Sequence, residues 1–409
     1  MTEAVDTIAM NHPDPLDPSN SALYPTGDHW AVFEELRAKD PVHYTEDSPF
    51  GPYWSVTRFD DVKHVDTSHQ IFSSEPVIVI GDPPPEEILP QFIAMDQPRH
   101  DEQRKGVTGA VSPRQLATLE PLIRERVCGI LDSLPVGERF DWVDTVSIEL
   151  TTQMLATLFE FPFEERRKLT HWSDAATSSP ALTGATNLTD EERMAILMEC
   201  LEYFNQLWAD REGQDGHDFV SLMANSEAFK DMEPLEYLGN LILLIVGGND
   251  TTRNSISGGV YALNKFPEQF DKLRADQSLI PNMVSEIIRW QTPLAHMRRI
   301  AKEDSVLGGK TIKAGDKVVM WYISGNRDEG IFEDPDKLII DRPNARQHIS
   351  FGYGIHRCMG NRLGEMQLKI LWEEILNRFA HVEVLDEPER VTSNFVMGYT
   401  HMPVMLHPK

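Results

Sequence analysis

The sequence is poor in cysteine, and it has no long apolar run. Three cysteines, Cys128, Cys200 and Cys358, occur in 409 residues, an odd number at wide spacing. This pattern excludes a disulfide framework and is typical of a reducing compartment. The longest apolar run, at residues 241–246, is far too short to span a bilayer. Residues 1–20 lack the basic and apolar segments of a signal peptide. We therefore expect a cytoplasmic protein without a membrane anchor.

Cations are also scarce. The chain has 38 Lys and Arg against 65 Asp and Glu, so its formal net charge is −27. A surface this acidic repels the phosphate backbone, and nucleic acid is excluded as a partner. Hydrophobic residues make up 41% of the chain, which is ordinary for a globular protein, and the length allows several domains or one large one.

The first hundred residues predict a loose arm followed by mixed structure. Residues 1–26 are acidic and rich in proline, and we expect a loose arm there. A helix from about residue 27 to residue 37 precedes two short strands, at residues 42–44 and 53–56. The glycine and prolines of residues 81–85 indicate a loop.

The rest of the chain is predicted to be mainly helical. From about residue 100 to residue 280, apolar residues recur at intervals of three and four. Strand-like segments return after residue 292, as at residues 317–321, and a last long helix covers about 361–379. The expected fold class is therefore mainly α with a minor β region near both ends of the chain.

The most informative segment is the glycine-rich loop around Cys358, in which Phe351, Gly354 and Gly360 complete the pattern. Glycine has no Cβ, so the backbone can approach a flat cofactor closely. A helix that begins after Gly360 points its first N–H groups at the sulfur, which favours thiolate over thiol. The segment predicts a thiolate ligand, although taken alone it leaves open a buried free cysteine.

This loop resembles the haem-binding loop of the cytochrome P-450 family, and the resemblance extends over nearly the whole chain. It implies one triangular, mainly α domain over residues 27–409. It also implies haem b (iron protoporphyrin IX) as the cofactor, with Cys358 as the axial iron ligand and with Phe351 and Gly352 in the cofactor-binding loop. The implied activity is that of a monooxygenase, which inserts one oxygen atom of O2 into a C–H bond of a substrate.

A second segment, residues 241–252, is apolar along most of its length and then changes abruptly to Gly247, Gly248, Asp250 and Thr251. Glycine and a buried acid both destabilise a helix, and such conflicts are expected where function lies. In the family the equivalent helix crosses the open face of the haem. The resemblance implies that the glycines leave room for O2 and widen a helical turn. It also implies that the Thr251 hydroxyl holds a water and that Asp250 relays protons from solvent.

A haem carries two propionates, so cationic donors should converge on them. His100 and Arg104 are spaced i,i+4, which puts both on one helix face, and they match a His and Arg pair of the family. Arg299 matches its strand arginine in preference to Arg298, and His356 matches the fourth donor.

Glu286 and Arg289 match the Glu-x-x-Arg helix pair of the family. Their spacing allows the two side chains to meet, and we expect Arg342 from a later loop to join them. This cluster is expected to be structural and not catalytic.

The sequence predicts a separate protein as the electron donor. No flavin or nicotinamide domain follows the last helix, so electrons are expected from a ferredoxin-type donor with its reductase. Basic residues in segments expected near the cysteine could dock an acidic partner. They are Lys105, Arg114, Arg346, Arg357, Arg362 and Lys369. We expect a monomer.

The substrate is expected to be small and apolar, because the residues that match the family's pocket are apolar or small. They are Leu243, Val246, Gly247, Leu294, Ala295, Phe395 and Val396, with residues 77–80 as a roof. Residues 247–255, 296–299 and 350–367 look most like bacterial alkane and fatty-acid terminal hydroxylases. Gly364, where the family usually has alanine, departs from the pattern and is expected to loosen helix packing behind the cysteine.

Three alternatives remain. One is a hydroxylase of terpenes or steroids. A haem-based gas-binding sensor needs no proton relay, and peroxide-using relatives tend to lack the acid–alcohol pair, so Asp250 and Thr251 argue against both.

Overall fold

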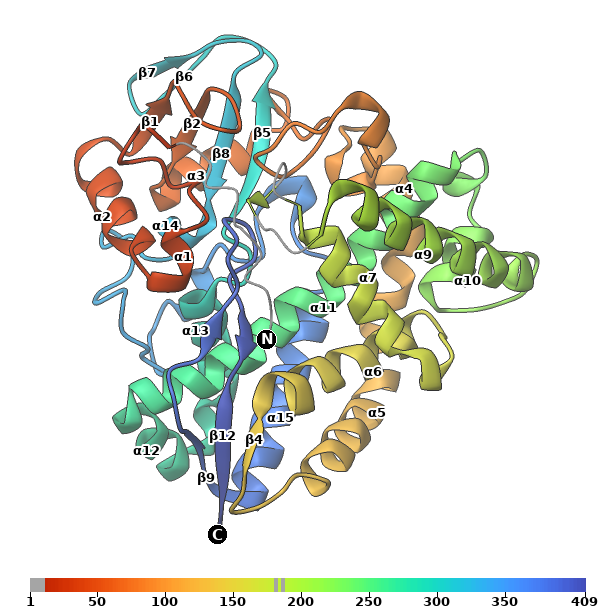
Figure 1. Ribbon diagram of the computed structural model, residues 1–409, viewed down its shortest axis with the longest axis vertical. Coiled ribbons are helices and arrows are strands. Elements are labelled where there is room, and N and C mark those ends of the chain that lie inside the picture. The colour runs from red at the N-terminus through yellow and green to blue at the C-terminus, as the bar shows by residue number, and fades with distance from the viewer. Residues whose placement is uncertain (1–11, 180–182, 185–187) are drawn as a thin grey trace.

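The computed structural model describes residues 12–179, 183–184 and 188–409. The fold is mainly helical, as predicted, and Figure 1 shows a molecule that is broad at the end holding the larger sheet and tapers toward the C-terminus. The α-helices of the described residues are α1 (Leu23–Thr26), α2 (His29–Lys39), α3 (Phe59–Thr67), α4 (Arg99–Val107), α5 (Pro113–Asp132), α6 (Glu149–Leu158), α7 (Arg167–Thr177), α9 (Asp190–Arg211), α10 (Phe219–Ala224), α11 (Pro234–Lys265), α12 (Pro267–Ala275), α13 (Ile280–Gln291), α14 (Tyr322–Gly325) and α15 (Asn361–Arg378).

The strands form a minor part of the fold and, apart from β4 (Arg139–Asp141), they come from the two end regions of the chain, as predicted. The largest sheet has the order β1-β2-β8-β5-β3, in which β2 and β8 are parallel and the other pairs are antiparallel. Its strands are β1 (Val42–Thr45), β2 (Tyr53–Val56), β3 (Phe72–Ser73), β5 (His296–Ala301) and β8 (Lys317–Trp321). The smaller sheets contain β4 (Arg139–Asp141), β6 (Ser305–Leu307), β7 (Lys310–Ile312), β9 (Phe379–Val384), β10 (Glu389–Arg390), β11 (Tyr399–His401) and β12 (Pro403–Pro408).

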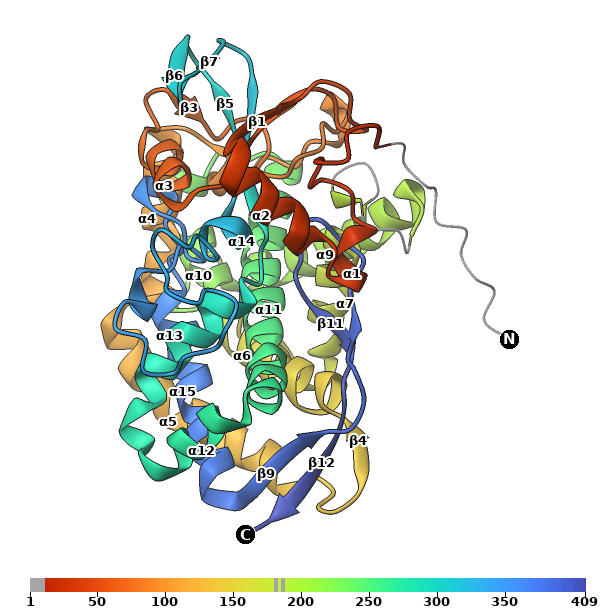
Figure 2. The same cartoon turned by 90° about the vertical axis from the view of Figure 1, so that its left-hand side faces the viewer.

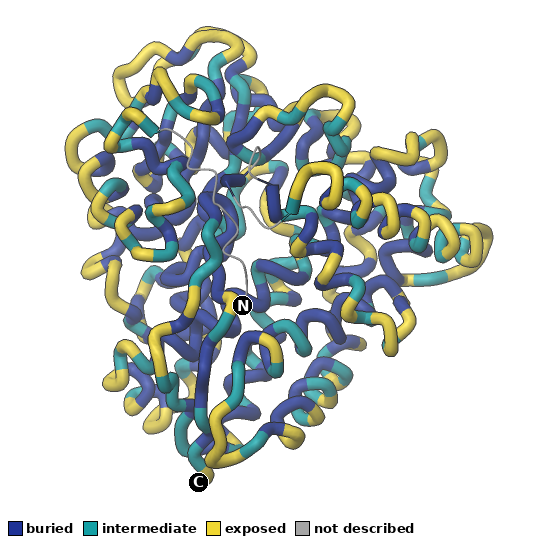
Figure 3. The backbone as a smooth tube through the Cα atoms, in the orientation of Figure 1, coloured by how far each residue is buried: buried dark blue, intermediate teal, exposed yellow. Residues whose placement is uncertain are grey.

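Helix α11 lies at the centre of the molecule, and α6, α7, α13 and α15 pack against it. In Figure 2 it runs through the middle of the molecule. Burial follows the same plan: Figure 3 shows buried residues (dark blue) through the middle and exposed ones (yellow) along the outer loops and helices. Among the described residues, no helix combines the length and the hydrophobicity that a membrane crossing needs.

The segment before α1 is packed where the structure describes it, so the predicted loose arm is wrong for residues 12–26. Asp17 is buried, and its carboxylate accepts a hydrogen bond from the Tyr53 hydroxyl at 2.5 Å. The hydroxyl of Tyr24, also buried, donates to the Pro18 carbonyl at 2.8 Å. Acidic and proline-rich composition suggested looseness, but Asp17 is held by Tyr53 of the folded body and Tyr24 is buried. Residues 1–11 are outside the described residues.

The cluster around Glu286 is confirmed. Its carboxylate accepts hydrogen bonds from Arg289 at 2.7 Å and from Arg342 at 3.0 Å, and all three side chains are buried. Arg289 also donates to the carbonyls of Asn326 and Pro335. The cluster therefore ties α13 to the irregular segment that leads to Cys358.

Candidate active site

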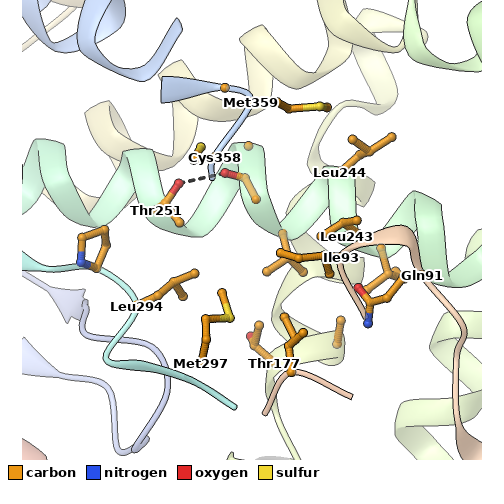
Figure 4. A pocket seen from close by; sticks show the side chains of 18 of the residues that line it. Gln91, Ile93, Thr177, Leu243, Leu244, Thr251, Leu294, Met297, Cys358 and Met359 are labelled. Atoms are coloured by element: carbon orange, nitrogen blue, oxygen red, sulfur yellow. Dashed lines mark hydrogen bonds between the residues drawn. The ribbon is translucent and has the colours of Figure 1, made fainter. Parts of the chain in front are cut away.

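Cys358 lines a cavity of about 340 Å³ that lies between the loop preceding α15, the middle of α11 and the segment of residues 77–93. In Figure 4, Cys358 and Met359 lie at one side of this space, close to Thr251. Leu294 and Met297 extend into the same space from the sheet side. The cavity thus brings together the two segments that the sequence marked as functional.

The loop around Cys358 is held by its own backbone and by α3. The Cys358 N–H donates to the Phe351 carbonyl at 2.8 Å, which closes the loop. Gly354 has a φ of 68°, and a Cβ there would come within 2.7 Å of the Asp66 carbonyl oxygen. This glycine therefore serves the turn and its packing on α3. Gly360 lines the cavity, so it is the glycine of this pattern at which the backbone can approach a cofactor, as expected.

Two effects oppose each other at the Cys358 sulfur. Desolvation by the surrounding protein raises the pKa of the thiol, and this is the larger effect, although the side chain is accessible from the cavity. Backbone N–H groups of Gly360 and Asn361 at the start of α15, and the charges of Arg104 and Arg357, act to lower that pKa. The groups expected to favour thiolate are therefore in place around the sulfur. A metal ion bound there would deprotonate the thiol outright.

Polar nitrogen atoms gather at one wall of the cavity. Arg104, Arg299 and His356 line it, as does Gly352, whereas His100 lies behind His356 with their ring centroids 4.2 Å apart. Within the described residues, neither ring nitrogen of His356 has a hydrogen-bond partner, and His100 Nε2 has none. Burial lowers the pKa of His356 to about 2, and Arg299 adds to this effect, so the ring is neutral. Two arginines and unused imidazole nitrogens on one wall suit an anionic group.

Arg299 is fixed by Asp66 of α3, a residue that the sequence did not mark. Its Nη2 lies 2.8 Å from Asp66 Oδ1, and both side chains are buried. Asp66 Oδ2 also accepts the Tyr353 N–H at 2.7 Å and the Tyr322 hydroxyl at 3.0 Å. One carboxylate therefore positions both the arginine and the loop that carries Cys358.

Arg298, the rejected alternative, does not line the cavity. It is buried with its Nη1 2.9 Å from the Gly81 carbonyl and 2.5 Å from Asp82. Adjacent strand residues point to opposite faces, which explains why only Arg299 reaches the cavity.

The two glycines of α11 have different roles. A Cβ at Gly247 would meet nothing within 4 Å, and this glycine lines the cavity, as expected. A Cβ at Gly248 would lie 2.7 Å from Leu155 Cδ2, so this glycine allows α6 to pack closely. The helix is continuous from Pro234 to Lys265, and the expected widened turn is absent from it. The Thr251 hydroxyl donates to the Gly247 carbonyl at 2.8 Å and lines the cavity.

Asp250 does not line the cavity, unlike its neighbour Thr251. Its carboxylate is fully buried, with Oδ1 2.7 Å from Arg253 Nη2 and Oδ2 accepting the Ser173 hydroxyl at 3.0 Å. Arg253 continues to Asp174 Oδ1 at 2.9 Å, and the Asp174 side chain is 52% exposed. Burial raises the pKa of Asp250, while the charge of Arg253 opposes the rise. A chain of polar groups thus leads from the surface to the residue beside Thr251.

Five of the seven predicted pocket residues line the cavity, namely Leu243, Val246, Gly247, Leu294 and Phe395. Ala295 and Val396 do not. Ala295 is buried in the cluster around Trp321, and Val396 pairs with Leu294 through a backbone bridge. The alternation of side chains along extended backbone sends each one away from the cavity when its neighbour faces it. Of the predicted roof, residues 77–79 line the cavity and Ile80 does not.

Comparison with known proteins decides the family. The family model described as cytochrome P450 matches residues 118–404. The chain belongs to the cytochrome P450 family. Among solved structures, cytochrome P450-153 from Novosphingobium aromaticivorans is 51% identical to this P450, with a TM-score of 0.91, and the match covers 96% of this chain and 100% of that one.

Curated relatives match over nearly their whole length. Linalool 8-monooxygenase of Pseudomonas putida is 34% identical over 405 residues, covering 96% of this P450 and 99% of the relative. Methyl-branched lipid omega-hydroxylase of Mycobacterium bovis is 31% identical over 426 residues, covering 99% of both chains.

The residues of this P450 fit the haem iron that its family implies. The thiol of Cys358 supplies a soft ligand at the cavity wall. Arg104, Arg299 and His356 line the cavity where anionic propionates could be held, and neither ring nitrogen of His356 has a partner among the described residues. Haem held by a cysteine thiolate supplies activation of O2 and transfer of one oxygen atom. The chain itself supplies the binding site, the exclusion of water and the supply of protons. The apolar walls exclude water, and the Thr251 hydroxyl can hold a proton donor at the cavity.

Several residues of the site were not found from the sequence. Asp66, Ser173 and Arg253 are polar residues whose role depends on partners distant in the chain. Arg253 alone carried a usable signal, because its i,i+3 spacing from Asp250 allows a pair on one helix face. Gly364 stands where the family usually has alanine, and the structure has room for that methyl group. A Cβ there would lie 3.8 Å from Thr252 Oγ1, an ordinary contact.

Proposed function

We propose that this P450 hydroxylates the terminal methyl group of a linear alkane or fatty acid, with haem b as the cofactor and O2 as the co-substrate. The observation that carries the proposal is the apolar lining of the cavity near Thr251. Leu243 and Val246 of α11 converge there with Leu294 and Phe395 from distant segments. The name of the related omega-hydroxylase supports attack at a chain end.

Terminal attack requires positional control. A primary C–H bond is stronger than a secondary one, so a terminal methyl reacts only when internal methylenes are kept away. Side chains that present one end of a chain to the reaction centre supply this control by orientation. The four apolar side chains named above are suited to this role, because they come from separate segments of the chain and line the same cavity.

Proton supply is assigned to Thr251 and Asp250. The hydroxyl of Thr251 lines the cavity and holds a water close to the oxygen site. Asp250 exchanges protons with solvent along Ser173, Arg253 and Asp174 and passes them on when its carboxylate leaves Arg253. The raised pKa of Asp250, caused by burial, eases its protonation and suits this task.

We infer that a ferredoxin-type protein with its reductase supplies electrons to a monomeric enzyme. Arg346, Arg357 and Arg362 are exposed, and all three act to lower the pKa of Glu365, so they lie close to one another near the cysteine loop. Lys105 and Arg114 are exposed as well, whereas Lys369 is paired with Glu373 at 3.2 Å. In a protein with a net charge of −27, such a cationic group favours an acidic partner.

A terpene is the second candidate substrate, supported by the 34% identity to linalool 8-monooxygenase. Both candidates are tested by titrating the haem-loaded protein with linear alkanes and fatty acids of increasing length, with linalool and with a steroid, while the Soret band is recorded. Affinity should rise by about 0.8 kcal/mol per methylene and then level off when the cavity is full. Chromatography of products formed with a surrogate ferredoxin and reductase should give mainly terminal alcohol. Mainly subterminal alcohol, or preference for a fused-ring substrate, contradicts the proposal.

A further inference from the structure

Arg193 occupies an apolar position of α9. Buried residues along this helix recur as a stripe at Leu197, Cys200, Leu201 and Phe204, and Arg193 is the first member of that stripe. Its side chain is only 5% exposed. Because the stripe faces the protein interior, a guanidinium is placed where the helix pattern calls for an apolar residue.

The guanidinium of Arg193 is poorly paired. The carboxylates that face it, Glu87 and Asp190, are each 3.5 Å away, and its Nε has no hydrogen-bond partner among the described residues. Arg253, a comparable buried arginine, has carboxylate contacts of 2.7 and 2.9 Å. A buried guanidinium without close partners is unfavourable unless another anion completes its coordination.

Arg193 lines the same cavity as Cys358 and Thr251. Its loose partner Glu87 begins the segment that continues to Gln91, and Figure 4 shows Gln91 on the side of the cavity away from Cys358. Leu197, one turn after Arg193, also lines the cavity. Arg193, Glu87 and Gln91 thus line the cavity together with apolar side chains, and the contact between Arg193 and Glu87 places the arginine beside the segment that carries Gln91.

We propose that Arg193 binds the carboxylate of a fatty-acid substrate, whose chain extends along the apolar walls so that its methyl end lies at Thr251. The inference rests on the proposed terminal hydroxylation and adds a preference for the acid over the alkane. Guanidinium and carboxylate match geometrically and form charge-assisted hydrogen bonds. The Gln91 amide can donate a further hydrogen bond. Glu87, whose side chain is 35% exposed, moves toward solvent when the substrate carboxylate takes its place.

The test compares three ligands of equal carbon number: a medium-length saturated fatty acid, its methyl ester and the alkane. Dissociation constants are measured by Soret titration of haem-loaded wild-type, Arg193→Gln and Arg193→Lys proteins. Arg193→Gln should weaken binding of the acid about ten- to hundred-fold, the range expected for a hydrogen bond between charged groups, and leave the ester and alkane within about two-fold. Arg193→Lys should restore part of the affinity for the acid. Arg211→Gln on the same helix is the matched control, because Arg211 pairs with Asp218 and does not line the cavity.

Glu87→Gln provides a second variant in case Arg193→Gln does not fold. Removal of the competing carboxylate should tighten binding of the acid several-fold and leave the ester unchanged. Equal effects on acid and ester in these variants, or no effect on either, overturn the role of Arg193. If the wild-type protein forms terminal alcohol from alkane and ester with no preference for the acid, only this inference fails. If the wild-type protein binds none of the three ligands, both this inference and the proposed function fail.

Discussion

Asp250 and Arg253 form a buried ion pair of 2.7 Å within one turn of α11, and this pair directs the acid away from the cavity that Thr251 lines. The acid–alcohol pair is therefore divided between two environments. The hydroxyl is available to the cavity, whereas the carboxylate is held among polar groups that lead to the surface. The proposed delivery of protons by Asp250 consequently requires the ion pair to open.

Replacement of Thr251 by alanine should uncouple the reaction. Without the hydroxyl, the protein still consumes reductant and oxygen but releases peroxide in place of product, and Thr251→Ser should retain coupling. Asp250→Asn should lower the rate about hundred-fold or more with a smaller effect on coupling, because a positioned proton donor contributes about 10²–10⁴-fold to the rate. Peroxide and product are quantified per reductant consumed. Unchanged rate and coupling in both Ala and Asn variants would contradict the assignment.

Ligation by Cys358 has a spectroscopic signature. The reduced protein under carbon monoxide should absorb at the long wavelength typical of thiolate ligation, and Cys358→Ala should abolish this band. Cys200→Ala is the matched control, because Cys200 is buried, does not line the cavity and has a pKa raised by burial. A Cys358→Ala protein that keeps the band is incompatible with the assignment.

The sequence predicted those features that depend on neighbouring residues. The last long helix, the loop around Cys358 and the polar interruption of α11 are all local patterns, and each was placed correctly. Features that depend on distant partners were missed. Strand β4 interrupts a long helical region because it pairs with β12, and Asp17 is buried because Tyr53 binds it.

The same distinction applies within the site. The sequence identified Arg299 because it lies in a predicted strand. It could not show that Asp66 holds this arginine, because the two residues are 233 positions apart in the chain. Leu294 and Ala295 were both assigned to the pocket, although extended backbone allows only one of them to face it. A family pattern identifies a segment, and the register of the segment decides which side chains reach the cavity.

Removal of the Glu286 carboxylate should destabilise the protein strongly. Glu286→Gln leaves the positive charges of two buried arginines, Arg289 and Arg342, without their shared carboxylate, and loss of a partner from a buried ion pair costs about 3–5 kcal/mol. Denaturant unfolding followed by circular dichroism measures the change. Asp304→Asn serves as the control, because Asp304 pairs with Lys313 on the exposed surface and its loss should have little effect. Equal stability of the two variants contradicts the structural role of the cluster.

Acid should weaken the fold through His296. Its Nε2 accepts the Ile80 N–H at 3.2 Å and its Nδ1 donates to the Asn394 carbonyl at 3.0 Å, so the ring is neutral. Burial lowers its pKa from 6.5 to about 3. Because the folded pKa is below the unfolded one, the unfolded chain binds the additional proton. The contribution to stability is therefore complete above pH 6.5 and is lost as the pH falls toward about 3.

His296→Gln isolates this contribution. Between about pH 6 and about pH 4, the difference in free energy of unfolding between the wild-type protein and the variant should fall by about 1.4 kcal/mol per pH unit. Other titrating groups cancel in this difference. A difference that is independent of pH would show that His296 is not held neutral.

Regiochemistry should depend on Leu294. Its side chain lines the cavity opposite α11, and truncation to alanine removes a wall that keeps internal methylenes from the reaction centre. Leu294→Ala should therefore move product from the terminal alcohol toward internal alcohols, with lower affinity for the substrate by about 1–3 kcal/mol. Val396→Ala is a close control, because Val396 is buried and bridges to Leu294 through the backbone but does not line the cavity. It should lose stability through the space it leaves and keep terminal selectivity. A shift of product in Val396→Ala as large as that in Leu294→Ala would assign selectivity to general loosening of this segment, because only contact with the substrate distinguishes the two positions.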